Sequence, residues 1–518
     1  LTLNYGEPEI EQKSVNLTVG SDETSRNLTW YANSETAGQV QYAKKSDMTN
    51  GQFPSEYQTA DAISSQSNES GFYSNQATMR NLDENTEYVY RVVNGETVSK
   101  EYTFQTGDFD GAFSFAFVGD PQIGAGSLPS DIQGWNDTLD VIKNQLNPDF
   151  LFSAGDQVNT ANNESQYTGY LNDTFSSLTS ATTIGNHDSS SAAYNEHFNL
   201  PNESAQYGAT TAGSDYWFVY NNTLFMDINS NDRSAAEHKQ FMQDAIAANP
   251  DVRWKTVVFH HSIYSTASHA SDGDIIDRRN ELPQIFDELD IDVVLMGHDH
   301  VYTRTYMMDG FTPDRSQGVQ SSVTNPTGIL YLTANSASGS KYYGITAPEA
   351  EYAAVQDQSK RRTVTNVEVT NTSYTMTTYF ADDMSVLDTF TIYKTLNTAD
   401  MESLISQAQG LNQADYTEES WNKLQAALKA AMELKSNANA TQSDIDAAAT
   451  ALQEAIDGLV KVDNQDGGVV NTENPSNEQI NGPQTGDTAN AVEIVSAVSA
   501  FIAAGTIVVV LTKKKMNS

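Results

Sequence analysis

The spacing of hydrophobic and polar residues divides the chain into segments of different predicted structure. In residues 1–107, short runs alternate between apolar and polar positions, which predicts β-strands with one buried face. In residues 108–395, apolar runs alternate with amphipathic stretches, which predicts strands and helices packed in layers. Residues 396–460 place Leu and Ala at helical spacing. We therefore expect a multidomain chain with a β-sandwich, a layered α/β domain and a small α-helical module.

The β-sandwich expected in residues 1–107 contains one distinctive corner. Leu82 is followed by a polar turn and then by the strand Thr86–Val92, in which Tyr88 takes an inward-facing position. This arrangement resembles the tyrosine corner of fibronectin type III domains. The resemblance implies that Tyr88 caps the corner through its hydroxyl. The segment shows no chemistry of its own, so we expect its role to be structural.

Several apolar runs of the α/β segment end in short clusters of polar residues. Such a run predicts a buried strand that delivers side chains to a site at its carboxyl end. Helices are predicted between the runs, over Asp131–Gln145 and Ala235–Ala248. The runs are Phe113–Val118, Asp149–Ala154, Ala181–Ile184, Trp254–Phe259 and Asp292–Met296. The polar residues that follow them are, in order, Asp120, Asp156, Asn186 with His187, His260, and His298 with His300.

Each polar cluster has an ordinary structural explanation when it is taken alone. Gly-Asp is a common turn, and a histidine at the end of a strand is more often hydrogen-bonded than a ligand. Together they favour a metal site, because two ions about 3.5–4 Å apart can clamp a phosphoryl oxygen and hold a hydroxide for in-line attack. Carboxylate and imidazole donors suit Zn, Fe, Mn or Co better than Cu or Ca. No thiolate can take part, because the chain has no cysteine.

Composition narrows the classes of partner. The chain has 518 residues and a formal net charge of −40. A chain this acidic repels the phosphate backbone of DNA or RNA, so we expect no nucleic acid binding. Hydrophobic residues make up 38% of the chain, which fits folded domains rather than a disordered polymer.

The motifs that follow the predicted strands come in the order GD, GD, GNHD, VVFH and GHDH. This order resembles that of calcineurin-like metallophosphoesterases. The leading β domain, and Arg304 four residues after His300, resemble the purple acid phosphatase branch of that family. The resemblance implies an αββα sandwich that holds two metal ions, with Fe, Zn and Mn as the candidates. It implies that the first metal is bound by Asp120 and His300, that Asp156 bridges, and that the second metal is bound by Asn186, His260 and His298.

The same resemblance implies roles for residues outside this ligand set. His187 would contact the phosphate or protonate the leaving alcohol. His269, nine residues after His260, would be a second proton donor or phosphate contact. Arg304 would bind phosphate or merely pair with an acid.

The chain departs from the purple acid phosphatase pattern in two places. Purple enzymes have a tyrosine three residues after the bridging aspartate, and this chain has Asn159 there. Gln122 follows Asp120 and Pro121, where other metallophosphoesterases often carry a metal-binding histidine. Gln122, Asn159 or water would then complete the ligands of the first metal. Without the phenolate we expect no purple colour, a divalent first metal and a working pH nearer neutral than acid.

The remaining histidines receive structural predictions. We expect His261 to point to the other side of its strand end, His197 to pack a loop, and His238 to be solvated on a polar helix face.

Four residues beside the predicted ligands have open roles. Asp188 and Asp299 each neighbour a histidine, so they are candidates for orienting imidazoles through hydrogen bonds. Tyr264 and Tyr302 would either line the cleft or pack in the core.

The helical module has a recognisable sequence pattern. The segment Tyr416–Leu459 resembles the FIVAR modules of bacterial surface proteins. Within it, Thr441 followed by Asp444 three residues later predicts the start of a helix. A glycan or matrix ligand for this module is an open alternative.

The end of the chain carries an anchor-like pattern. Residues 461–486 are rich in Asn, Gly and Asp, which predicts a linker. Residues 487–518 contain the apolar stretch Val492–Leu511, about one membrane span long, and then three lysines. With Pro483–Gly486 before it, this order resembles a Gram-positive sortase signal, although Gly482 stands where that signal usually has Leu. A plain transmembrane anchor is the alternative.

These observations predict an extracellular phosphatase anchored to the cell wall or membrane of a Gram-positive bacterium. It would hydrolyse phosphate monoesters of small molecules by attack of a metal-bound hydroxide, and sortase would join it to cell-wall peptidoglycan. A phosphodiesterase or nucleotidase on the same metal core is one alternative. The other is a non-enzymatic adhesin or glycan-binding protein whose metal site is idle.

Overall fold

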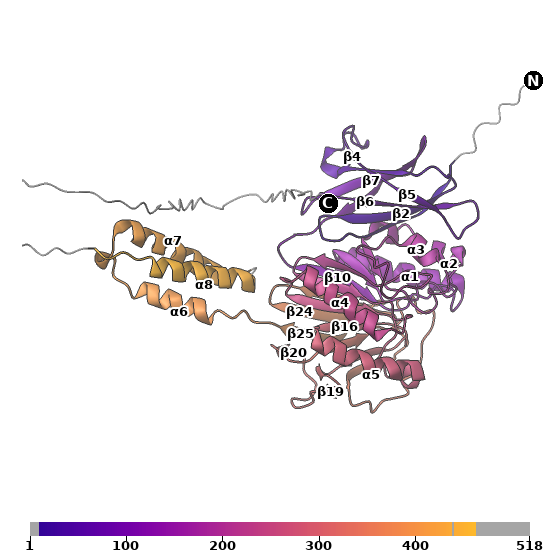
Figure 1. Ribbon diagram of the computed structural model, residues 1–518. Helices are drawn as coiled ribbons and strands as arrows, with labels where there is room; N and C mark the ends of the chain where they lie inside the picture. The colour runs from indigo at the N-terminus through magenta and orange to yellow at the C-terminus, as the bar shows by residue number, and fades with distance from the viewer. Residues whose placement is uncertain (1–9, 438–439, 463–518) are drawn as a thin grey trace, which may run out of the picture. The chain divides into compact units, whose positions relative to one another are not determined.

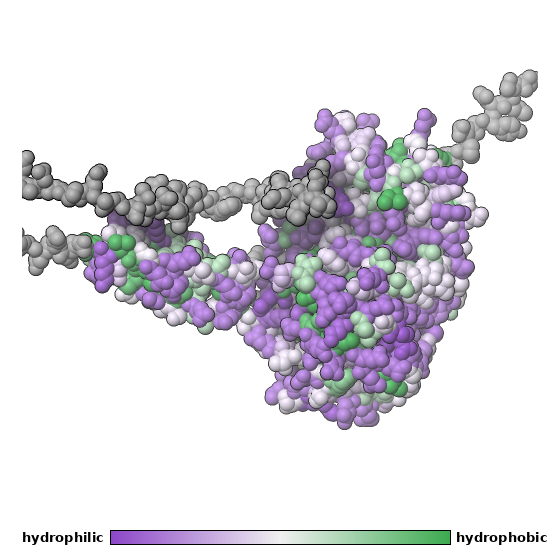
Figure 2. Space-filling view, in the orientation of Figure 1, coloured by the Kyte–Doolittle hydropathy of each residue, from purple (hydrophilic) through white to green (hydrophobic). Residues whose placement is uncertain are grey.

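The computed structural model describes residues 10–437 and 440–462 (Figure 1). The predicted sorting motif and apolar C-terminal segment lie outside these residues. Within the described part of the chain, no helix is long and apolar enough to cross a membrane. The face drawn in Figure 2 is mostly hydrophilic with small hydrophobic patches, in keeping with the net charge of −40.

The N-terminal segment is a sandwich of two antiparallel sheets over an apolar core that includes Leu17, Trp30 and Val40. One sheet contains β1 (Gln12–Val19), β2 (Arg26–Ala32), β6 (Tyr73–Met79) and β5 (Ile63–Gln66). The other contains β4 (Gln58–Asp61), β3 (Gln39–Lys44), β7 (Glu87–Asn94), β8 (Thr97–Val98) and β9 (Tyr102–Gln105). The predicted corner is present, because the buried Tyr88 hydroxyl accepts a hydrogen bond from the backbone N–H of Asp83 over 2.8 Å.

The first sheet of the sandwich continues into the α/β domain. Strand β1 pairs in parallel with β12 (Ser180–Thr182), with Thr18 opposite Ser180. Beyond β12 the sheet runs through β11 (Phe150–Ser153), β10 (Phe113–Val118), β23 (Thr363–Val369), β24 (Ser373–Phe380), β25 (Val386–Tyr393) and β20 (Ser322–Thr324). His197, in the short helix α3 (Ala193–His197), is buried between the rings of Tyr31 and Tyr167. It therefore packs the junction of the two domains rather than a loop.

A second sheet packs on the first, and helices cover it. Its strands, in order, are β13 (Tyr216–Tyr220), β14 (Thr223–Asp227), β15 (Trp254–Phe259), β16 (Val293–Met296), β21 (Leu330–Thr333), β17 (Tyr302–Thr305) and β22 (Ala353–Asp357). Along β15, Val258 faces the core shared with the first sheet, while Val257 and Phe259 face α4 (Ala235–Ala248) and α5 (Gly273–Glu288). Helices α1 (Leu128–Val141) and α2 (Glu164–Tyr170) pack into the shared core. The α/β domain is thus layered, as predicted.

Strand direction decides where the polar clusters meet. Strands β10, β11 and β12 run parallel to one another, and so do β14, β15, β16 and β21. Their carboxyl ends therefore share one edge of each sheet, which is where sites form in parallel sheets. The two edges are joined, because the imidazole Nδ1 of His260 lies 2.9 Å from the backbone oxygen of Ala154.

The helical module is a bundle of α6 (Ala399–Gln409), α7 (Glu418–Lys435) and α8 (Gln442–Asp457) around a core that includes Met401, Leu424 and Leu452. The predicted start of the last helix is confirmed. Thr441 and Asp444 form a capping box, in which each side chain accepts from the other residue's backbone N–H.

The prediction that His238 is solvated is wrong. Its side chain is buried, and Nδ1 lies 2.8 Å from a carboxylate oxygen of Asp215. Burial disfavours the charged imidazole, but the hydrogen bond and charge of Asp215 outweigh it and raise the pKa of His238. The sequence did not predict this burial, because the partner of His238 lies in a loop more than twenty residues earlier.

We expect His238→Ala to lower the free energy of unfolding by about 3 kcal/mol, because it leaves the Asp215 carboxylate buried without its partner. A raised pKa in the folded state adds stability that is fully present below the unfolded pKa and is lost as pH rises through the folded pKa. The difference between wild type and variant, measured by chemical denaturation, should therefore be larger at pH 6 than at pH 9. The control is Gln240→Ala on the exposed side of α4, and equal effects of the two substitutions would contradict the prediction.

Candidate metal centre

The loops after β10, β11, β12, β15 and β16 bring the predicted ligands together. Four of these ligands have an uncommon backbone conformation. Asp120, Asp156, His298 and His300 all have positive φ, between 39° and 72°. Positive φ is uncommon for residues other than glycine and clusters at functional sites. The glycine between β16 and His298 makes room for this arrangement, because a Cβ on Gly297 would lie 2.7 Å from Oδ2 of Asp120.

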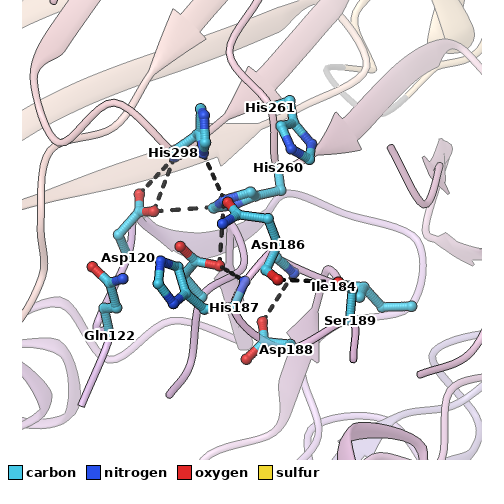
Figure 3. A network of polar contacts seen from close by, with 12 residues as sticks. Asp120, Gln122, Ile184, Asn186, His187, Asp188, Ser189, His260, His261 and His298 are labelled. Carbon is cyan, nitrogen blue, oxygen red and sulfur yellow. Dashed lines mark hydrogen bonds and ion pairs between the residues drawn. The ribbon is translucent and has the colours of Figure 1, made fainter. Parts of the chain in front are cut away.

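The centre of the cluster consists of Asp120, Asp156 and His260. One potential ligand atom from each lies within 4.8 Å of the others, and all three side chains are buried. The Nε2 atom of His260 is 3.4 Å from Oδ1 of Asp156 and 2.9 Å from Oδ1 of Asn186. Figure 3 shows the His260 ring lying between Asp120 and Asn186.

The two histidines of the GHDH motif approach the same carboxylate. The backbone N–H of His298 donates to both oxygens of Asp120, over 3.0 and 2.9 Å, and its Nδ1 lies 3.1 Å from Nε2 of His260. The Nε2 of His300 is 3.5 Å from Oδ1 of Asp120, while its Nδ1 is 2.8 Å from the backbone oxygen of Lys341. Because Nδ1 donates to that carbonyl, the lone pair of Nε2 faces the cluster.

His187 lies at the edge of the cluster. Its backbone N–H donates to Oδ1 of Asp156 over 2.8 Å. Its ring Nδ1 lies 2.8 Å from the backbone oxygen of Asn159, which fixes the ring by a donated hydrogen bond. The Nε2 atom has no hydrogen bond within the described residues, so it is free for a substrate. Both Asn186 and His187 are at least partly exposed, unlike Asp156.

Charges in the cluster are unbalanced. Burial, and then the charge of Asp156, raise the pKa of Asp120 well above its ordinary value against the opposing charge of His260. Burial lowers the pKa of His300 to about 4, and burial with the neighbouring histidines lowers that of His298 well below its ordinary value. The imidazoles of His298 and His300 therefore favour the neutral, metal-binding form. The pKa of His260 is instead raised to about 9, because the neighbouring Asp156 and Asp120 carboxylates outweigh the effect of its burial. This donor set fits bound cations.

Gln122 supplies a further donor. Its side chain is buried, and its Nε2 donates to Oδ1 of Asn159 over 3.3 Å. Its Oε1 is buried and has no hydrogen-bond partner within the described part of the chain. A buried carbonyl oxygen without a partner is costly, and a cation would satisfy it. Because the amide oxygen of Asn159 is already engaged, Gln122 is the better candidate of the two.

The comparisons with known proteins agree with this geometry. Residues 113–302 match the calcineurin-like phosphoesterase family, residues 12–106 match the N-terminal domain of purple acid phosphatases, and residues 397–460 match the FIVAR domain. The calcineurin-like phosphoesterase match covers the part of the α/β domain that carries the metal centre. The predicted enzyme class, a phosphoesterase, is thereby confirmed, and this family implies divalent metal ions.

Two solved structures share the fold of this chain. Purple acid phosphatase PPD1 from seeds of yellow lupin (Lupinus luteus) superposes with a TM-score of 0.61 at 16% identity, over 74% of each chain. PhoD superposes with a TM-score of 0.50 at 12% identity, over 73% of this chain and 89% of that one. At these identities the likeness establishes the fold alone, a metallophosphoesterase fold with an N-terminal β-sandwich.

The curated relatives are similar over short stretches. An alpha-L-arabinofuranosidase of Bifidobacterium longum subsp. longum is 36% identical over 101 residues, which are 20% of this chain and 9% of that protein. A lacto-N-biosidase of the same organism is 41% identical over 61 residues, 12% of this chain and 4% of that protein. The chain thus spans less than a tenth of the length of these relatives.

His269 joins the phosphoesterase centre through its ring. The ring centroid is 4.5 Å from that of His298, and the backbone N–H donates to Oδ1 of Asp299 over 3.1 Å. Nδ1 lies 2.7 Å from a carboxylate oxygen of Asp272, the residue before α5. Sequence reasoning missed Asp272, although its place three residues after a candidate histidine was a usable signal.

Arg304 is not part of the phosphoesterase centre. Its guanidinium is buried in β17 and pairs with Asp388, with 2.5 Å between Nε and Oδ2, and it packs on the ring of Phe390. Its other nitrogens donate to Asp388 and to backbone oxygens. The catalytic assignment is therefore corrected, and the alternative of pairing with an acid holds. Tyr302 donates to the same Asp388, so it is also a core residue.

Three other predictions about neighbouring residues, those for His261, Asp188 and Asp299, are corrected. His261 does not point away, because its ring centroid is 4.7 Å from that of His298, and its Nδ1 lies 2.8 Å from the Ser230 hydroxyl. Asp188 accepts from backbone N–H groups of Gly185, Gln157 and Val158, and so it holds loops rather than an imidazole.

Asp299 likewise has no hydrogen bond to an imidazole among the described residues. It accepts from the Ser265 hydroxyl and from the backbone of His269, so it holds the loop that carries His269. Tyr264 is buried against Tyr331 and Tyr352, which is the packing alternative.

We expect Gln122→Leu to weaken metal binding about 10–100-fold, the range for residues that support a metal site, because it removes the unpartnered oxygen and keeps the volume. Asn159→Leu should have a smaller effect, since its amide oxygen contacts Gln122. Competition with a chromophoric chelator measures both without any substrate. Equal or stronger weakening by Asn159→Leu would assign the ligand to Asn159 instead.

Proposed function

We propose that this chain is an extracellular phosphatase that hydrolyses phosphate monoesters at a centre of two metal ions. The observation that carries the proposal is the meeting of Asp120, Asp156 and His260 in one buried cluster at parallel strand ends. Asp120, His300 and Gln122 would hold one ion and Asn186, His260 and His298 the other, with Asp156 between them. Such ions, when bound, supply positive charge to a phosphoryl oxygen and a reactive water at neutral pH.

The protein's own residues would complete the site around the ester. The Nε2 atom of His187 is free, and its ring is fixed by Asn159, so it can contact the phosphate or hand a proton to the leaving alcohol. His269 has its Nδ1 against Asp272, which leaves Nε2 for a second contact of the same kind. Neither role requires either ring to move far, because both lie beside predicted ligands.

An extracellular location is supported by the net charge and by the sortase-like pattern around Pro483–Gly486. The FIVAR domain would be a ligand-binding module beside the enzyme. Protease treatment of intact source cells should remove the phosphoesterase domain from the cell surface. Full protection until the cells are lysed would contradict this location.

A direct assay tests the activity. The protein is stripped with a chelator and then supplied with Zn, Mn or Fe, and turnover of p-nitrophenyl phosphate and its bis ester is compared. We expect metal-dependent turnover with a preference for the monoester. A preference for the bis ester would assign a phosphodiesterase, and no metal-dependent turnover of either would favour a non-enzymatic protein.

A further inference from the structure

A loop from outside the predicted motifs is fixed directly onto the metal centre. In residues 335–344, the hydroxyl of Ser336 donates to the backbone oxygen of Asp120 over 3.0 Å. The hydroxyl of Ser340 donates to the backbone oxygen of Pro121 over 3.2 Å. The backbone oxygen of Lys341 lies 2.8 Å from Nδ1 of His300. The loop therefore holds a fixed position relative to two predicted ligands.

The loop places an aromatic ring and a cation beside the histidines. The ring centroid of Tyr343 is 4.9 Å from that of His269 and 5.3 Å from that of His300, and it is nearly perpendicular to both. The Nζ atom of Lys341 lies over the Tyr343 ring, 4.6 Å from its centroid. This is a cation–π contact, which orients the ammonium without neutralising it. Lys341 and Tyr343 are both partly exposed, so a ligand can reach them.

Lys341 has no acidic partner within the residues that the structure describes. Other lysines of the same domain pair with carboxylates, Lys255 with Asp290 and Lys394 with Asp292. The ammonium of Lys341 has three N–H donors and makes neither an ion pair nor a hydrogen bond there. A chain with a net charge of −40 repels anions at long range, so an unpaired cation beside the centre provides local attraction for an anionic group.

We propose that Lys341, held by Tyr343, binds a second anionic group on the leaving alcohol of the phosphate ester. The substrate class is then a phosphate monoester whose alcohol carries a carboxylate or a second phosphate. This inference rests on the proposed function and specifies its substrate. An aromatic leaving group fits less well, because Lys341 already occupies a face of the Tyr343 ring.

Matched substrates test the charge preference. Glycerol 3-phosphate and 3-phosphoglycerate share a three-carbon skeleton, and the second has a carboxylate in place of the hydroxymethyl group. The monophosphate and bisphosphate of 1,3-propanediol make the same comparison for a second phosphate. We expect kcat/KM to favour the charged member of a pair by about tenfold, the scale of one charge-assisted hydrogen bond. A preference in only one pair identifies which anion is taken, and equal rates within both pairs would overturn the proposal.

Variants assign the preference to this loop. Lys341→Met should abolish it and Lys341→Arg should keep it, while Lys143→Met, an exposed lysine of the same domain, should change nothing. Tyr343→Phe should keep the preference, because the ring holds the ammonium, and Tyr343→Ala should weaken it. An unchanged ratio in Lys341→Met would overturn the proposal even if all esters are hydrolysed.

A binding measurement separates this inference from the proposed function. Calorimetry compares propylphosphonate with 3-phosphonopropionate, which differ by one carboxylate and cannot be hydrolysed. Tighter binding of the second, lost in Lys341→Met, supports the subsite even if no ester is turned over. Equal binding of the two, or no binding of either, overturns it.

Discussion

Replacing Asp156 with asparagine is expected to lower kcat/KM for a phosphate monoester by at least about a thousandfold, beyond the about 10–100-fold typical of residues that only support a metal site. Asp156 is buried, and its Oδ1 lies within 3.4 Å of Nε2 of His260. Asparagine keeps the shape but loses the charge that would be shared by two cations. Kinetic assays with added metal and measurement of bound metal by mass spectrometry check both parts.

The fold should survive this substitution. An asparagine oxygen can still accept from the backbone N–H of His187, and the charge of Asp156 no longer acts on the buried Asp120. Circular dichroism and the melting temperature should therefore stay close to those of wild type. Asp140→Asn, on the exposed side of α1, is the control for the same chemical change. Retained activity in folded Asp156→Asn would refute the bridging assignment.

The positions of the site residues could be predicted because the signal is local. Each apolar run that ends in a polar pair is short, and parallel strands bring their ends to one edge. The strands Phe113–Val118 and Trp254–Phe259 and the helix Ala235–Ala248 have the bounds predicted from the sequence. These elements have clear periodicity or continuous burial, and nothing distant is needed to define them.

Elements without a buried stripe could not be predicted in this way. Strands β4 and β5 are mostly exposed, so they show no alternation between apolar and polar positions. Helix α5 begins at Gly273 and contains Pro283, both unfavourable for a helix in isolation. The burial of α5 against β15 and β16 compensates for this unfavourable helix propensity. Packing therefore decides these elements, rather than their own sequence.

Predictions of residue roles were wrong where the interaction partner is distant along the chain. Arg304 appeared to be a phosphate contact by its spacing from His300, but Asp388 arrives from β25 and pairs with it. Lys341 and Tyr343 belong to a loop with no motif, and only the contacts of His300 reveal them. Spacing predicts which residues share a strand end, but not which charges meet across the sheets.

The second large effect is expected at Gly297. A Cβ added there would lie 2.7 Å from Oδ2 of Asp120 and 2.9 Å from the backbone oxygen of Ala154. Ala154 directly follows β11, so its backbone cannot move cheaply and the Asp120 carboxylate must shift. A displacement of about 1 Å in a reacting group can cost about a hundredfold in rate, and we expect that loss in Gly297→Ala.

A glycine-to-alanine substitution elsewhere in the domain distinguishes the steric effect of the added Cβ from the general effect of losing a glycine. Gly273, the first residue of α5, has nothing within 4 Å of an added Cβ, so Gly273→Ala should keep full activity. Overpacking at Gly297 should also lower the free energy of unfolding by about 1–3 kcal/mol, measured by chemical denaturation. Metal affinity should fall with it, because Asp120 is a predicted ligand. A folded Gly297→Ala protein with wild-type activity would show that the Asp120 carboxylate can move without harm, which would contradict its assignment to the first metal.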